Sequence, residues 1–97
     1  MAEAGYRLSP LALADLESIW SWTARQWSAE QAESYHVSLV AAFEGLSSGR
    51  KKGQAVDVRD GYFKYAVGSH LVFYRPSTAG IDVIRILHQR MDVERHL

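Results

Sequence analysis

The last ten residues, HQRMDVERHL, gather side chains that could bind a metal, move a proton or contact a partner. His88 and His96 are of a type that ligates transition metals, and Arg90 and Arg95 could hold an anion. The two histidines are separated by seven residues and the chain contains no cysteine, so the spacing matches no zinc signature. We therefore expect no metal and no cofactor here and interpret the segment as a contact surface.

A second chemistry to consider is RNA cleavage without a metal, in which cations hold the phosphate and a histidine or tyrosine moves protons. The second half of the chain supplies such side chains: Lys64, Tyr65, His70, Tyr74, Arg75, Arg85 and His88. Alternation along a strand places His70 and Tyr74 on one face, and Arg85 on one face with Leu87. Lys and Arg also commonly solvate a sheet, and tyrosine rings commonly pack. We assign no catalytic residue and keep a ribonuclease as the alternative.

Composition limits the class of protein. The 97 residues are 47% hydrophobic, which predicts a single domain over residues 1–97 with one core. The absence of cysteine excludes a disulfide framework. The N-terminus MAEAGYRLSP lacks the features of a signal peptide, and no apolar run approaches the ~20 residues that cross a bilayer. We expect a cytoplasmic protein with no membrane contact.

Charge is unevenly distributed although the formal net charge is zero. Residues 1–48 carry two basic and six acidic side chains, a net charge of −4, whereas residues 49–97 carry nine basic and five acidic ones, a net charge of +4. The second half therefore suits an anionic partner, either nucleic acid or an acidic protein segment. The alternative is that the two halves neutralise each other across the fold.

Two helices are expected in the first half. Ser9-Pro10 is typical of an N-cap followed by proline at the first helical position, and Ser28 with Gln31 matches a capping box. Gly49 suits a left-handed C-terminal cap. Apolar steps of three and four predict two buried stripes, Ala12, Leu16, Ile19, Trp20, Thr23 and Trp27, then Ala32, Tyr35, Leu39, Ala42, Phe43 and Leu46. With almost no linker between them, these helices should form an antiparallel hairpin.

The second half is expected to form an antiparallel sheet. Residues 62–67 and 70–75 read as strands joined by the turn Gly68-Ser69, and residues 50–60 read as a loop with a short extended piece at 55–58. Residues 76–80 should turn into a third strand, 81–88. There Ile84 and Ile86 should face one way, with Val83 and Leu87 facing the other.

These elements predict an α+β fold, a helical hairpin packed on a three- to four-stranded antiparallel sheet, with residues 6–8 as a possible added strand. The three tryptophans fall near the hairpin. Trp20 and Trp27 lie on the buried stripe, while Trp22 either marks a contact surface or covers the edge of the core.

Taken together, several stretches of the chain resemble the ParE branch of the RelE/ParE toxins. They are YRLSPLALADLESIW, AEQAESYHVSL, VGSHLVFYR and IDVIRILHQRMDVERHL, and they span nearly the whole chain. The resemblance implies a helical hairpin against an antiparallel sheet. It also implies the toxin of a bacterial type II toxin–antitoxin pair, aimed at DNA gyrase and neutralised by a ParD-like ribbon-helix-helix antitoxin.

The resemblance gives three hypotheses. The first is a toxin that inhibits gyrase by binding and has no enzymatic activity; it meets DNA only through antitoxin or gyrase, in a heterotetramer or larger assembly. The second is a RelE-like ribosome-dependent ribonuclease that uses Lys64, Arg75, Arg85 and His88. The third is a relic that binds antitoxin without toxicity.

Two sets of contact residues follow from the first hypothesis. The target-binding candidates belong to the C-terminal segment, in which Asp92 should cap a short terminal turn, and Met91 and Leu97 should pack on the body: His88, Arg90, Met91, Arg95 and His96. The antitoxin-binding candidates lie on the first helix and the strands: Trp22, Tyr62, Lys64, Tyr74, Arg75 and Arg85.

Overall fold

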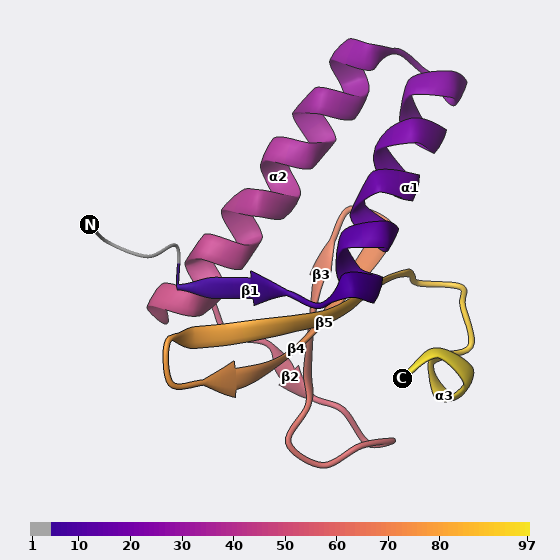
Figure 1. Ribbon diagram of the computed structural model, residues 1–97. Coiled ribbons are helices and arrows are strands. Elements are labelled where there is room, and N and C mark those ends of the chain that lie inside the picture. The colour runs from indigo at the N-terminus through magenta and orange to yellow at the C-terminus, as the bar shows by residue number, and fades with distance from the viewer. Residues whose placement is uncertain (1–4) are drawn as a thin grey trace.

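The structure is a computed structural model that describes residues 5–97, and it consists of one sheet with two long helices packed on it (Figure 1). In chain order the elements are β1 (Tyr6–Leu8), α1 (Pro10–Gln26), α2 (Ala29–Ser48), β2 (Gln54–Ala55), β3 (Phe63–Val67), β4 (His70–Ser77), β5 (Gly80–His88) and α3 (Val93–His96). The α+β prediction is confirmed.

The sheet has the strand order β1-β5-β4-β3-β2 and is mostly antiparallel. It has five strands where three or four were expected, because the two-residue β2 pairs with β3 and β1 joins the opposite edge. β1 pairs with β5 in parallel. A parallel pair requires a long connection, and the helical hairpin together with β2, β3 and β4 supplies it.

Both N-caps and the C-terminal cap form, although in residues 5–97 the Gln31 side chain makes no bond back to the Ser28 N–H, so the predicted capping box is only half formed. The Ser9 hydroxyl accepts a hydrogen bond from the Ala12 N–H at 3.0 Å, and the Ser28 hydroxyl accepts one from the Gln31 N–H at 2.9 Å. Gly49 ends α2 in the left-handed region, at φ 85°. These caps fix where the two helices begin and where α2 ends, so the hairpin carries its stripes at the expected positions.

The main core lies between the helical hairpin and the sheet. Leu16, Leu39 and Phe43 are buried against the Val72 and Val83 side chains of β4 and β5. A second, smaller cluster forms on the opposite face of the sheet, where Val56, Phe73 and Leu87 are buried beneath partly buried residues that include Val93 and Leu97. β5 is therefore covered on both faces and has a strand on each side.

The residues of the two predicted stripes are buried or, at Ile19, Trp20 and Tyr35, partly buried; at Trp27 the prediction is wrong. This residue is 72% exposed, while Trp20 is partly buried. Trp27 is the C-cap of α1. It lies at the tip of the hairpin, which projects beyond the sheet (Figure 1). No strand lies beneath the tip to bury the indole, so helical periodicity alone places Trp27 on the wrong surface.

The predicted facing of β5 is also wrong. The cross-strand partners shift between Phe73 and Tyr74, which face Arg85 and Val83, so Ile84 is an extra residue in β5. This bulge puts Val83 and Ile86 in the same core, whereas Leu87 belongs to the opposite cluster. Strict alternation through Ile84 therefore fails.

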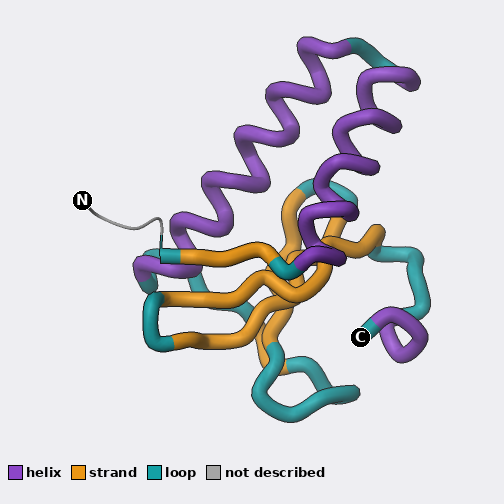
Figure 2. The backbone as a smooth tube through the Cα atoms, viewed as in Figure 1, coloured by secondary structure: helices purple, strands orange, loops and turns teal. Residues whose placement is uncertain are grey.

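The connections differ from expectation in two places (Figure 2). The extended piece expected at residues 55–58 is the strand Gln54–Ala55, and the chain turns from Asp57 onward. Pro76 lies inside β4 and pairs with Ile81, so the turn is only Thr78-Ala79. The pairing of β3 with β4 reaches only as far as Tyr74. Pro76 therefore has no β3 residue opposite it, and its missing N–H costs no hydrogen bond on the β3 side. Within residues 5–97, no helix has the length and apolarity to span a membrane.

Candidate functional site: a histidine-lined pocket

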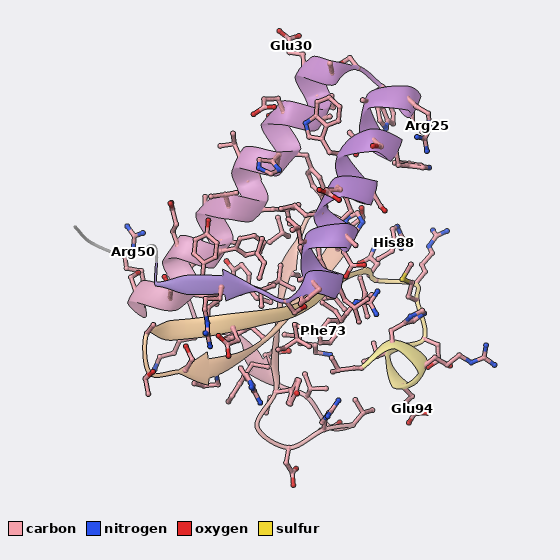
Figure 3. The ribbon with its side chains drawn as sticks, viewed as in Figure 1. Arg25, Glu30, Arg50, Phe73, His88 and Glu94 are labelled. Carbon is pink, nitrogen blue, oxygen red and sulfur yellow. The ribbon has the colours of Figure 1, made fainter. Side chains whose placement is uncertain are left out.

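A pocket of about 390 Å³ lies where α1 passes the open ends of β4 and β5. We call it the histidine pocket, and its lining residues are Ser18, Ile19, Trp22, Ser69, His70, His88 and Met91. In Figure 3, His88 lies at the end of β5, beside α1 and the segment that leads to α3. The pocket thus joins residues from three parts of the chain, namely α1, the start of β4 with the turn before it, and the end of β5 with the segment that follows.

The two histidines are neighbours across the sheet. His70 pairs with His88 in the antiparallel register of β4 and β5, and the ring centroids are 5.3 Å apart in an edge-to-face arrangement. Sequence reasoning missed this pair. The signal that could have found it is the strand register, since a tight turn at residues 78–79 and the bulge at Ile84 together bring His70 opposite His88.

His70 is held from the helical side by Tyr35 of α2. The Tyr35 hydroxyl lies 2.9 Å from the Val67 carbonyl oxygen and 2.8 Å from Nδ1 of His70. The hydroxyl uses its single proton to donate a hydrogen bond to the carbonyl. Towards His70 it therefore acts as the acceptor of a hydrogen bond from an N–H at Nδ1. Burial, and secondly the neighbouring His88, lower the pKa of His70 from its ordinary value of 6.5, and Asp15 partly offsets this.

His88 is oriented by the backbone that follows it. Its Nδ1 accepts a hydrogen bond from the Arg90 N–H at 3.1 Å. A ring nitrogen that accepts cannot carry the proton, so the neutral ring has its N–H at Nε2. Within the part of the chain that the structure describes, this Nε2 has no hydrogen-bond partner. His88 therefore keeps one donor available.

The rim of the histidine pocket is apolar and exposed. Trp22 from α1 is 53% exposed and Met91, just after β5, is 46% exposed. Trp22 is thus accessible to a partner, and its role as a contact residue stays a prediction. Met91 lines the pocket and does not pack into the body as fully as expected. Large exposed apolar side chains around a pocket are typical of contact surfaces.

Next to the pocket, α1 and β5 are joined by an ion pair. Arg85 Nε and Nη2 donate to the two Asp15 carboxylate oxygens at 2.8 and 2.9 Å, and both side chains are 15% exposed. Asp15 also accepts from the Ile86 N–H at 2.9 Å. The hydrogen bond to Asp15 raises the pKa of Arg85. Arg85 is thus committed to a structural partner, which leaves it little freedom to meet another molecule.

The other sheet candidates lie away from the pocket. Tyr74 is buried, and its hydroxyl accepts the Gly53 N–H at 2.9 Å. Arg75 is exposed and 3.7 Å from Asp82, which also pairs with Arg7. Tyr62 and Lys64 are partly buried on β3 and the residues before it. The structure gives Tyr74 a core position, while contact roles for the others stay predictions.

The C-terminal segment forms the expected short turn. Asp92 caps α3, with its carboxylate accepting the Glu94 N–H at 3.1 Å. Leu97 packs on the second cluster, as expected, and its carbonyl accepts a hydrogen bond from Arg59 at 2.5 Å. Arg95 is 83% exposed, and its nearest acid is Asp92 at 3.6 Å. Arg90, Arg95 and His96 are exposed, and their contact with a target stays a prediction.

Comparison with known proteins gives a consistent family. A family model described as the ParE toxin of the type II toxin-antitoxin system, parDE, matches residues 6–93. A protein named Toxin ParE1 from Mycobacterium tuberculosis (strain H37Rv) is 48% identical over 94 residues, which cover 95% of this chain and 96% of that one. Toxin ParE1 of Caulobacter vibrioides is 42% identical over 93 residues, with coverage of 95% and 96%.

Among solved structures, the fold is similar to a chain of the chromosomal ParDE TA system from P. aeruginosa. The TM-score is 0.74 at 17% sequence identity, and the match covers 86% of this chain and 92% of that one. At this identity the likeness concerns the fold, a helical hairpin on a mostly antiparallel sheet.

Proposed function

Because the chain belongs to the ParE toxin family of type II toxin–antitoxin systems, we propose that it inhibits DNA gyrase by binding and that a ParD-like antitoxin neutralises it. The observation that carries the proposal is the near full-length identity of 48% and 42% to two proteins named as ParE1 toxins. A cytoplasmic location follows, because gyrase and the antitoxin act there. DNA is reached only through antitoxin or gyrase.

The engagement of the basic side chains supports binding without catalysis. Arg85 is fixed to Asp15, and Arg75 is near Asp82. Phosphoryl transfer needs cations that are free to meet the phosphate and are directed at a common point. The close pairing of Arg85 with a carboxylate works against that role, whereas it suits a rigid binding scaffold. Arg75 is paired only loosely, at 3.7 Å with its side chain 53% exposed.

Gyrase inhibition is tested with purified proteins. We expect the full-length chain at stoichiometric amounts to block supercoiling by gyrase, or to trap cleaved DNA on it, and addition of the antitoxin to restore activity. A chain that arrests growth but leaves supercoiling and cleavage complexes unchanged would remove gyrase from the proposal. A chain that causes no growth arrest would favour the relic.

The surface for the target is proposed to be the exposed cationic part of the C-terminal segment. The Arg90 guanidinium makes no ion pair with any residue from 5 to 97, and Arg95 has only the exposed contact to Asp92. The double substitution Arg90→Ala and Arg95→Ala should abolish growth arrest while the antitoxin still co-purifies. The matched control is Arg25→Ala with Arg50→Ala, two exposed arginines far from this segment (Figure 3).

The antitoxin is proposed to be a ribbon-helix-helix protein in a heterotetramer or larger complex, held through exposed residues of α1 and the sheet. Trp22 is the strongest of these candidates because it combines exposure with an adjoining pocket. Light scattering of the co-expressed pair gives the stoichiometry, and a 1:1 complex that does not associate further would contradict it.

Ribosome-dependent RNA cleavage remains the second candidate, because one observation favours it. His70 and His88 lie side by side in a pocket, and a histidine with a lowered pKa is suited to accept a proton. Primer extension on cellular messages after induction would reveal new 5′ ends within minutes. Intact transcripts together with rising DNA-damage signalling would exclude this candidate.

A further inference from the structure

We propose that the histidine pocket is a binding site for a carboxylate carried on an apolar side chain or peptide, and that its occupant is an acidic segment of the antitoxin. The choice of occupant rests on the proposed function. The class of ligand rests on the pocket itself, through its apolar walls, its available nitrogen donor and the absence of acidic lining residues.

The apolar part of the ligand is recognised by the walls. Ile19 and Trp22 from α1 and Met91 after β5 supply the apolar lining, and Trp22 and Met91 are both about half exposed. A volume of about 390 Å³ admits a side chain of aromatic or large aliphatic size. Burial of the exposed indole and thioether by such a group removes apolar surface from water on both sides.

The charged part is recognised by the histidines. His88 presents an N–H at Nε2, because its Nδ1 is used by the Arg90 backbone. No carboxylate is among the seven residues that line the pocket in the described part of the chain. Arg90 contributes its backbone N–H to His88, and its exposed guanidinium is not part of the pocket lining. A hydrogen bond from the Nε2 N–H of His88 to a carboxylate is stronger than one to a neutral acceptor.

His70 is a second imidazole in the pocket, and it can gain a positive charge when an anion binds. The groups that face it are Tyr35 from α2, His88 from β5 and, through its charge, Asp15 from α1, which Arg85 holds. Burial and the neighbouring His88 lower the pKa of His70. The negative charge of a bound carboxylate would act in the other direction, because it stabilises the protonated ring. Ligand binding should therefore raise the pKa of His70.

A metal at the same place is disfavoured by the hydrogen bonds. Histidine ligands normally donate their second ring N–H to an acceptor, which leaves the other nitrogen free to bind the metal. His88 has the reverse arrangement, since its Nδ1 accepts from Arg90 and its Nε2 carries the proton. In residues 5–97, no group of three or more histidine, cysteine or acidic side chains could hold a metal ion.

The test uses a matched pair of probes, 3-phenylpropanoate and its uncharged amide, with the full-length chain and NMR detection at the Trp22 indole and the histidine rings. We expect the carboxylate to bind roughly 5- to 30-fold more tightly than the amide, as for hydrogen bonds to a charged group. We also expect free His70 to carry its neutral-form proton on Nδ1 and free His88 on Nε2, and the carboxylate to raise the pKa of His70.

Two variants locate the effect. His88→Phe, which keeps a ring but removes the N–H donor, should bring the carboxylate-to-amide ratio close to one, and His36→Phe, on α2 and outside the pocket, should leave it unchanged. Trp22→Ala should weaken both probes, and the control is Trp27→Ala at the exposed hairpin tip. Equal binding of the two probes, or binding of neither, would overturn the site even if a variant fails to fold.

The occupant is tested by competition with the co-purifying ribbon-helix-helix protein. Displacement of the bound carboxylate by the antitoxin supports the assignment. A complex that forms while the probe stays bound overturns the assignment of the occupant, and the proposed toxin–antitoxin pairing then stands. If no complex forms at all, the pairing itself fails, and the probe results still decide whether the pocket binds carboxylates.

Discussion

At the residue scale, the most consequential contact is the one between Tyr35 and His70. It connects α2 to the end of β4 and sets the tautomer of a histidine in the candidate site. The same ring of Tyr35 lies against the turn at Gly68, where an added Cβ would be 2.7 Å from it. Packing and proton chemistry therefore meet at a single side chain of the helical hairpin.

His70 should make stability depend on pH. Because the pKa of His70 is lower in the folded state than its ordinary value of 6.5, the unfolded chain binds more protons in this range. The free energy of unfolding should thus fall as pH decreases through 6.5, until the folded-state pKa is passed. Urea unfolding between about pH 5.5 and 8 measures this pH dependence of the free energy of unfolding. The range lies above the pH at which ordinary carboxylates titrate. His70→Asn should flatten the profile, and identical pH slopes in the two proteins would contradict the prediction.

Gly68→Ala should destabilise the fold through two effects. The residue has φ 56°, which disfavours a side chain, and its Cβ would meet the Tyr35 ring. Gly61→Ala is a matched control, since Gly61 has φ 82° but nothing within 4 Å of the added Cβ. We expect losses of about 2–3 kcal/mol at Gly68 and about 1 kcal/mol at Gly61 in the free energy of unfolding. Equal losses would mean that the turn moves away from Tyr35.

At the scale of elements, the two halves of β5 have different neighbours on one side. The first half, up to Val83, pairs with β1, whereas the second half lies beside α1. β1 ends at Leu8, and beyond it the Ser9 hydroxyl donates to the Ile84 carbonyl at 2.7 Å while Asp15 accepts the Ile86 N–H. Side chains of a helix thus satisfy backbone groups around the bulge that would otherwise lack partners. This attachment places Ser18, Ile19 and Trp22 over the histidine pocket.

Asp15→Ala should be among the more damaging single substitutions. It leaves the Ile86 N–H without its partner and the Arg85 guanidinium with only the His96 carbonyl at 3.4 Å. Both side chains of the Asp15–Arg85 pair are only 15% exposed. The expected loss in the free energy of unfolding is about 2–4 kcal/mol. Arg7→Ala breaks the exposed pair with Asp82 and should cost at most about 1 kcal/mol. Thermal melts of the two variants make the comparison. If both lower the melting temperature by a similar small amount, the pair between Asp15 and Arg85 contributes little to stability.

At the scale of the whole molecule, the two faces of the sheet are covered very differently. The helical hairpin covers one face with most of the core, whereas α3 and the loop after β2 cover part of the other over Phe73 and Leu87 (Figure 3). The C-terminal segment is therefore both a cover for a small apolar cluster and an exposed cationic surface. A test of its function must separate these two roles.

Deletion of residues 92–97 should abolish growth arrest, but part of the effect will be loss of stability. Removal of Val93 and Leu97 uncovers the cluster around Phe73, so the truncated chain should melt at lower temperature and bind a hydrophobic dye. The substitutions at Arg90 and Arg95 should leave the melting temperature within a few degrees of the parent. A truncated chain that is stable and still arrests growth would remove the C-terminal segment from the target surface.

The sequence alone determined the features that depend on local physics. Ser9-Pro10, the Ser28 N-cap and Gly49 set the helices, and the Gly68-Ser69 turn joined the β3 and β4 strands as expected. These signals are readable because caps and tight turns are formed by residues close together in the chain. Family membership was predicted from the quoted stretches and is confirmed by the relatives.

Only the tertiary structure decided which residues share a site. The bulge at Ile84 reversed part of the β5 pattern, the projecting hairpin exposed Trp27, and the strand register brought His70 opposite His88. Trp22 and Met91 were predicted for two different partners and line one pocket. The physical reason is that register, bulges and the docking of α1 depend on contacts between segments far apart in sequence, which periodicity does not encode.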